Sequence, residues 1–130
     1  YPYARTRESL ALLQRNGPAH AAHGYKMQFI NPATGGYAMP TMAAFVQLLP
    51  AGFSGDGYRS TDATVFHVIE GAGGVLIDGA QLDFAARDTF VVPAWSAYRL
   101  RSQDECVLFS FSDRPVQRAA GLWREQTLPA

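Results

Sequence analysis

The sequence has no net charge, a single cysteine and no long apolar run, and each of these shortages excludes a class of protein. Eleven basic residues balance eleven acidic ones, and no Lys/Arg cluster offers the basic surface that a nucleic-acid-binding protein needs. No segment is apolar for long enough to span a bilayer, and the N-terminus lacks the layout of a signal peptide. We therefore expect neither nucleic acid nor membrane as a partner.

The lone cysteine, Cys106, cannot form an internal disulfide, which suits a reducing compartment. It lies in an apolar run, so a small buried side chain is the simplest interpretation. We therefore expect a cytoplasmic protein. The chain also begins at Tyr1 and not at an initiator methionine. We expect such a start in an excised piece of a longer polypeptide.

The apolar content that the sequence does have is enough for one core. Its 130 residues are 48% hydrophobic and 17% charged, which is typical of a globular protein. The length suits one domain and is too short for two independent cores. We predict an N-terminal helix and linker over residues 1–24 and a single barrel over residues 25–130.

Helices are predicted only near the two ends of the chain. Thr6 is placed to cap a helix over residues 7–15. Toward the other end, Asp113 followed by Pro115 resembles a cap with proline in the first turn, and Gly121 ends that second helix. Both helices are short.

Between the helices, short apolar runs alternate with turn residues, the pattern of an all-β sandwich or barrel. Asp78-Gly79 separates two of these runs and predicts a tight hairpin, since both residues tolerate the positive φ that the turn requires. The predicted strands cover residues 26–30, 44–49, 64–69, 74–77, 81–84, 89–92, 98–101 and 106–111.

Two stretches, residues 57–71 and 87–98, resemble the signature segments of the cupin superfamily, a double-stranded β-helix or jelly-roll barrel. In that family, three histidines and a carboxylate point into the barrel mouth, because alternate residues of a strand face the same side. Hydroxyls and phenols bind a divalent metal ion poorly at neutral pH. We expect neither a metal nor a catalytic residue in this chain, because the corresponding positions hold Tyr58, Ser60, Thr64 and Tyr98.

The simplest role for these four side chains is to fill the barrel mouth. Two other roles stay open. Tyr58 and Tyr98 could serve as the acid/base pair of a metal-independent isomerase or epimerase. Together with Trp95, they could instead enclose a small aromatic acid in a stand-alone binding protein, although Trp95 could equally be a plug at the rim.

The three histidines point to no metal site. His20 and His23 have a spacing that can ligate a metal, but no third ligand lies nearby in the sequence, so a solvated linker is the better interpretation. His67 falls on the opposite face of its strand from the barrel-mouth positions. We expect it to pack against a neighbouring element, such as a partner subunit.

Five strings, in order and at fitting distances, resemble the C-terminal half of gentisate 1,2-dioxygenase and of its relatives that act on salicylate or 1-hydroxy-2-naphthoate. The resemblance covers nearly the whole chain. One turn departs from the general cupin pattern, because Ala86-Arg87-Asp88 stands where Pro-Gly-Asp is usual. The strings are residues 31–36, 39–41, 58–62, 107–115 and 121–125.

The resemblance implies a bicupin in which Fe(II) is held by histidines of an N-terminal barrel and the aromatic ring is cleaved there with O₂. The present chain would be the second barrel, without a cofactor and inactive alone. Its partners would be the N-terminal cupin domain of the same polypeptide and further copies in a homo-oligomer. The choice of aromatic acid would be made in the other barrel.

Overall fold

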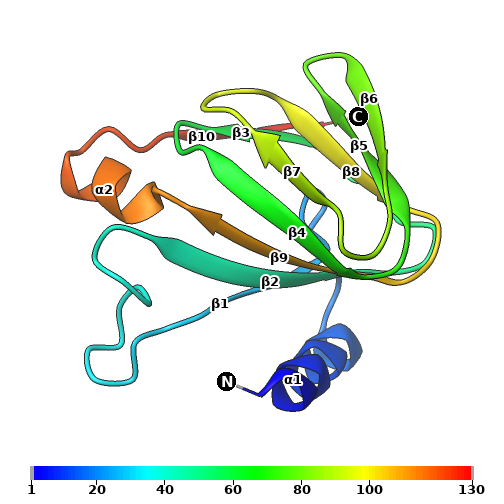
Figure 1. Cartoon of the computed structure of the whole chain (residues 1–130), viewed down its shortest axis with the longest axis horizontal. Helices are drawn as coiled ribbons and strands as arrows, with labels where there is room; N and C mark the ends of the chain where they lie inside the picture. Colours follow the sequence, from blue (N-terminus) through cyan, green and yellow to red (C-terminus); the bar gives the residue numbers. More distant parts are fainter. Residues whose placement is uncertain (1, 130) are drawn as a thin grey trace.

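A computed structural model describes residues 2–129 of the chain, so Tyr1 and Ala130, the outer bounds of the two predicted regions, lie outside the described residues. Two five-stranded antiparallel sheets pack face to face (Figure 1). The first sheet has the order β1 (Tyr25–Gln28), β2 (Ala43–Leu49), β9 (Cys106–Ser112), β4 (Thr64–Glu70), β7 (Thr89–Val92). The second has the order β10 (Glu125–Leu128), β3 (Gly57–Ser60), β8 (Tyr98–Ser102), β5 (Gly73–Ile77), β6 (Ala80–Phe84).

The core lies between the two sheets because side chains alternate along each strand. In β4, Thr64, Phe66 and Val68 are buried while the residues between them are partly exposed. Phe66 is fully buried and stacks on Phe90, with 4.9 Å between the ring centroids. Burial of one such side chain contributes about 2 kcal/mol. This arrangement confirms the predicted all-β cupin fold.

Helix α1 (Tyr3–Asn16) covers the outer side of the first sheet, beneath β1 and β2 in Figure 1. Its Leu10 is fully buried and packs with Val46 and Val107 of the sheet. The prediction that Thr6 caps this helix is wrong, because the helix begins at Tyr3 and its first amides bond to the Pro2 carbonyl. Thr6 lies one turn before Leu10 and is buried on the same face.

Helix α2 (Arg114–Ala119) follows β9 and has the predicted proline and glycine at its two ends, but the predicted cap by Asp113 is wrong. Pro115 lies in its first turn, and Gly121 has a φ of 71° and donates its N–H to the Arg118 carbonyl. Asp113 precedes the helix but makes no side-chain cap. Its Oδ1 instead accepts the Ala63 N–H at 3.0 Å, which fixes α2 to the turn between β3 and β4.

Two turns bear directly on the sequence predictions. Asp78 and Gly79 both have positive φ, 47° and 85°, so the predicted hairpin between β5 and β6 is confirmed. Arg87 has a φ of 77° at the position where cupins usually have glycine. The turn forms despite this substitution. The Arg87 N–H donates to the Val68 carbonyl at 2.7 Å, and Asp88 is hydrogen-bonded to Ala85 across the turn.

Strands β3 and β10 were not among the predicted strands. They pair with each other over four residues, whereas β3 pairs with β8 only at Tyr58 and Tyr98. The last strand of the chain therefore holds in place the strand that carries two barrel-mouth positions. No helix in the described part of the chain is long and apolar enough to cross a membrane.

Candidate functional site

Tyr58 of β3 and Tyr98 of β8 face each other across the second sheet. They are direct register partners, their ring centroids are 5.8 Å apart, and the rings meet edge to face. Both side chains are buried. The Tyr58 hydroxyl donates a hydrogen bond to Glu125 Oε2 at 2.6 Å. The structure thus brings the two tyrosines together and adds a carboxylate from β10.

Both phenols stay protonated at neutral pH. Burial, followed by the hydrogen bond to Glu125, raises the pKa of Tyr58. Burial, followed by the neighbouring Tyr58, raises the pKa of Tyr98. A protonated phenol is a weak metal ligand and cannot accept a proton as a general base. These groups therefore do not fit a ferrous ion, and their raised pKa values speak against the isomerase or epimerase alternative.

Ser60 and Thr64 lie beside a buried carboxylate that the sequence interpretation did not single out. Asp62, in the turn between β3 and β4, is 2% exposed. Its Oδ1 accepts a hydrogen bond from Trp123 Nε1 at 2.9 Å, and the Ser60 and Ser112 hydroxyls help to lower its pKa. Thr64 is the register partner of Ser112. All four predicted positions therefore surround one end of the barrel.

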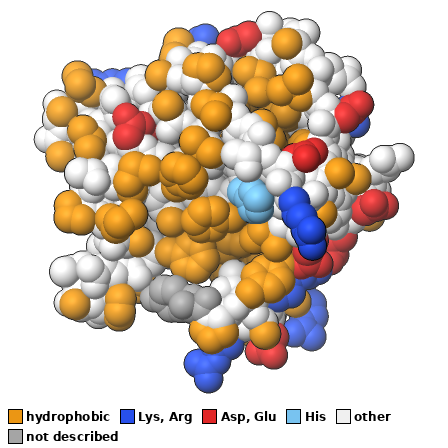
Figure 2. All heavy atoms as spheres, viewed as in Figure 1, with side chains coloured by type: hydrophobic (Ala, Val, Ile, Leu, Met, Phe, Trp, Pro, Cys, Tyr) orange, Lys and Arg blue, Asp and Glu red, His pale blue; other side chains and the backbone are white. Residues whose placement is uncertain are grey.

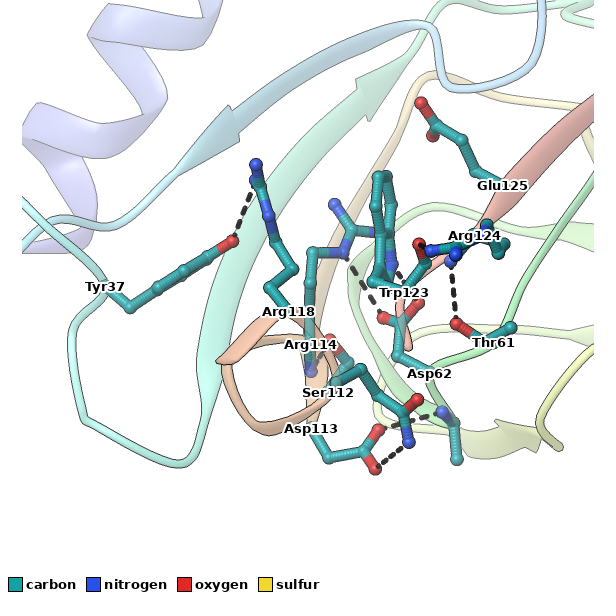
Figure 3. Close-up of polar contacts among 12 residues, drawn as sticks. Tyr37, Thr61, Asp62, Ser112, Asp113, Arg114, Arg118, Trp123, Arg124 and Glu125 are labelled. Atoms are coloured by element: carbon teal, nitrogen blue, oxygen red, sulfur yellow. Dashed lines mark hydrogen bonds and ion pairs between the residues drawn. The ribbon is translucent and has the colours of Figure 1, made fainter. Parts of the chain in front are cut away.

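Asp62 is held as an anion by these contacts (Figure 3). Arg114 Nε lies 3.4 Å from Oδ2 and forms an ion pair with it. Burial alone would raise the pKa of Asp62, but the hydrogen bonds and the Arg114 charge outweigh it and lower the pKa. The carboxylate is thus occupied by its own protein partners. Among residues 2–129, no three His, Cys, Asp or Glu side chains are grouped so that they could hold a metal ion.

A pocket of about 290 Å³ opens above Tyr58, between the segment that leads into β1 and the strand β10. Basic and aromatic groups dominate its walls. The Lys26 Nζ lies 4.5 Å from the centroid of the Phe45 ring. The Arg114 guanidinium lies 5.0 Å from the same ring and 4.7 Å from that of Trp123. The lining residues are His20, His23, Lys26, Met27, Gln28, Phe45, Tyr58, Arg114, Glu125 and Thr127.

The interpretation of His20 and His23 as part of a solvated linker is wrong for His23. The segment folds onto the barrel, with Ala22 fully buried in the core. The His23 ring meets Tyr58 edge to face at 4.4 Å and stacks on His20 at 4.8 Å. Burial, followed by the charge of Lys26, lowers the pKa of His23 to about 2, so this imidazole is neutral.

The other side chains named from the sequence lie outside the pocket. Trp95 is 39% exposed, and the Arg59 guanidinium covers its ring at 4.4 Å. His67 lies on the outward face of β4, as predicted, with Nδ1 3.0 Å from Thr89 Oγ1. Cys106 is buried, which confirms the predicted small buried side chain, and burial raises the pKa of its thiol to about 11.

The sequence interpretation gave no role to four charged residues and one tryptophan that shape this site. A signal for most of them was present, because four of the five lie within strings that carry the family resemblance. Those strings, distant along the chain, converge at this end of the barrel. The residues missed are Lys26, Asp62, Arg114, Trp123 and Glu125.

Comparison with known proteins points to one group of enzymes, although no family model matches the chain. Gentisate 1,2 dioxygenase 1 of Aquipseudomonas alcaligenes is 49% identical over 96% of this chain and 36% of its own length. The 5-aminosalicylate 1,2-dioxygenase of a Comamonas species is 33% identical over 100% of this chain and 35% of its own length. The chain therefore spans about a third of the curated relatives it matches.

The solved structures agree with the sequence matches. Salicylate 1,2-dioxygenase of Pseudoaminobacter salicylatoxidans, in a structure with gentisate adducts, superposes with a TM-score of 0.90 at 32% identity. The superposition covers 98% of this chain and 36% of that one. The sequence strings, the fold and these matches concur: the chain is a cupin domain that is similar, over nearly its whole length, to about a third of the gentisate and salicylate 1,2-dioxygenases.

Proposed function

We propose that the chain is the C-terminal, metal-free cupin domain of a gentisate 1,2-dioxygenase-like protein and that its role is structural. The observation that carries this proposal is the barrel mouth, where protonated tyrosines and a carboxylate occupied by protein partners replace metal ligands. The match to about a third of each relative supports it. Fe(II) and ring cleavage belong to an N-terminal cupin domain of the same polypeptide.

An apolar surface on the first sheet supports a packing role. We call it the outer sheet face and define it by Val65, Val91, Phe109 and Phe111. Val65 lies between Val91 and Phe111 in the register of the sheet, and Val91 is 53% exposed. Figure 2 shows hydrophobic side chains gathered over this side of the molecule.

Val65, Phe109 and Phe111 are half-buried, and an apolar surface that stays partly exposed in this way is suited to an interaction site. The occupant that we propose for the outer sheet face is the N-terminal cupin domain, because the relatives are far longer than this chain. Assembly of such two-domain chains into a homo-oligomer and a cytoplasmic location are parts of the same proposal. The buried, protonated Cys106 suits a reducing compartment.

A chimera tests the proposal directly. In the Aquipseudomonas enzyme, the segment that matches this chain is replaced by the chain itself, and the rest is kept. We expect a soluble chimera that binds iron and cleaves gentisate, since the catalytic barrel is untouched. A folded chimera without iron or activity would contradict a purely structural role. The matched control replaces the same segment by that of the Comamonas enzyme.

A stand-alone protein that binds a small aromatic acid is the second candidate. The pocket beside Tyr58 favours it, but Trp95 does not line that pocket. The candidate predicts that the isolated chain is monomeric and stable. Concentration-dependent self-association in sedimentation velocity, abolished by Val91→Asp on the outer sheet face, would favour the domain proposal instead.

A further inference from the structure

Lys26 is the only lysine in the sequence, and its position is unusual for a charged side chain. Its Nζ points over Phe45 into the pocket beside Tyr58. Within residues 2–129, no carboxylate forms an ion pair with it and no hydrogen bond from it is formed. The Lys26 side chain is half-buried, and an ammonium group in such a place normally has an anionic partner. Lys26 therefore has no carboxylate in direct contact, and Asp62 and Glu125 act on it only from a distance.

A second cation lines the same pocket. Arg114 and Lys26 approach the same Phe45 ring, at 5.0 Å and 4.5 Å from its centroid. Arg114 directs Nε at Asp62 Oδ2, 3.4 Å away, and within residues 2–129 its terminal nitrogens form neither an ion pair nor a side-chain hydrogen bond. Figure 3 shows this end of the guanidinium directed away from Asp62. Terminal guanidinium nitrogens are suited to binding a planar carboxylate.

The rest of the pocket limits what can enter. Most of the wall is polar, and Phe45, Met27 and Tyr58 add the apolar surface that the organic part of an anion can contact. Among the described lining residues, Glu125 is the one acidic side chain, and its carboxylate accepts the Tyr58 hydrogen bond. A nearby negative charge disfavours a doubly charged ligand. The volume of about 290 Å³ admits only a small molecule.

From this arrangement, we infer that the pocket binds the carboxylate of a small organic acid between Lys26 and Arg114, with the organic part against Phe45. The bound anion supplies a counter-charge in direct contact with Lys26 and relieves the repulsion between the two cations. This site is separate from the packing role proposed above, since the outer sheet face lies on the other side of the first sheet. It also differs from the arrangement predicted from sequence, because Trp95 takes no part.

Calorimetric titration of the full chain with benzoate tests the inference, with benzamide as the uncharged control and inorganic phosphate as the doubly charged one. We expect saturable binding of benzoate with a dissociation constant of about 1 mM, and at least about tenfold weaker binding of the other two compounds. Equal binding of benzoate and benzamide would overturn the role of the cations. Tighter binding of phosphate would overturn the choice of a carboxylate.

Variants show whether the binding occurs in this pocket. Lys26→Met keeps the length of the side chain and removes its charge, so benzoate affinity should fall about tenfold. Arg15→Met removes one charge from the exposed end of α1 and should leave the affinity unchanged. Glu125→Gln keeps an acceptor for Tyr58 and removes the opposing charge, so affinity should rise. Unchanged affinity in Lys26→Met, with its fold intact by circular dichroism, would refute the site.

Nuclear magnetic resonance of Lys26 provides a readout that does not depend on affinity. Burial, followed by the charge of Arg114, lowers the pKa of Lys26 to about 7, while Asp62 and Glu125 oppose the shift. His20, His23 and Tyr58 also face the pocket. A bound carboxylate favours the charged ammonium and should raise this pKa by about one unit or more. Because the chain has one lysine, its ¹³Cε signal reports this group alone, and an unchanged pKa at saturating benzoate would contradict the inference.

Discussion

Single side chains at the barrel mouth join distant parts of the chain, and Asp62 is the clearest case. Its carboxylate connects the turn before β4 with β9, α2 and the C-terminal segment through Ser112, Arg114 and Trp123. A carboxylate at this place resembles a metal ligand in type. Its partners show that it acts as a structural anchor.

Replacing Asp62 with Asn should cost about 3 kcal/mol of unfolding free energy, because it leaves the largely buried Arg114 without its counter-charge. Urea denaturation measures the loss. The matched control is Asp83→Asn, whose carboxylate pairs with Arg101 on the surface and should cost less than about 1 kcal/mol. Equal losses of unfolding free energy in the two variants would show that burial does not make the Asp62 contacts more stabilising than the surface ion pair.

The same network predicts a pH dependence of stability. The pKa of Asp62 is lower in the folded chain than in the unfolded one, so its stabilisation is complete above the unfolded value of about 4. It is lost as pH falls through the lower folded pKa. The stability difference between wild type and Asp62→Asn should therefore be constant near neutral pH and shrink in acid. A difference that grows in acid would contradict the assignment.

Gly73 is a position at which the barrel has no room for a side chain. A Cβ at this position would lie 2.2 Å from the Arg101 carbonyl oxygen of the neighbouring strand β8. Gly73→Ala should therefore destabilise the chain by more than about 2 kcal/mol, since backbone must move. Gly17→Ala is the matched control, because a Cβ there would meet no atom within 4 Å and its φ is extended. Thermal denaturation compares them, and similar melting temperatures would refute the clash.

At the scale of elements, the strands with apolar alternation were predictable and the two polar ones were not. Strand β4 shows one buried face and was placed within one residue. Strand β3 has a glycine and an arginine in four residues, and β10 is mostly exposed. Each is a strand because it pairs with the other, a contact between residues far apart in the sequence. The pocket was missed for the same reason, since its walls come from both ends of the chain.

Deletion of residues 125–130 should loosen β3 specifically. It removes four register pairs and the Glu125 acceptor of Tyr58, and it leaves β3 with one pair to β8. Amide hydrogen exchange of residues 57–60 should become at least about tenfold faster. Residues 64–70 of β4 serve as the internal control, because β7 and β9 still flank that strand. Unchanged protection of β3 would show that β10 is dispensable.

At the scale of the whole molecule, the same barrel combines a mouth that does not fit iron with an outer sheet face suited to a partner. The fold class was predictable because turn spacing and cupin segments agree along the chain. The four positions aligned with cupin metal ligands were named from the sequence, and the structure places all four at one end of the barrel. The charged and aromatic side chains around the barrel mouth come from α2, β10 and the segment before β1. These segments are far apart in the sequence, so no local pattern predicts that they meet there.

The iron content of this chain, measured together with gentisate cleavage after anaerobic incubation with Fe(II), tests the central claim most directly. Protonated phenols and hydroxyls cannot compete with water for the ion, so we expect no stoichiometric iron after desalting and no ring-cleavage product. The Aquipseudomonas enzyme provides the positive control in the same assay. About one iron per chain with turnover of gentisate would contradict the account of a metal-free structural barrel.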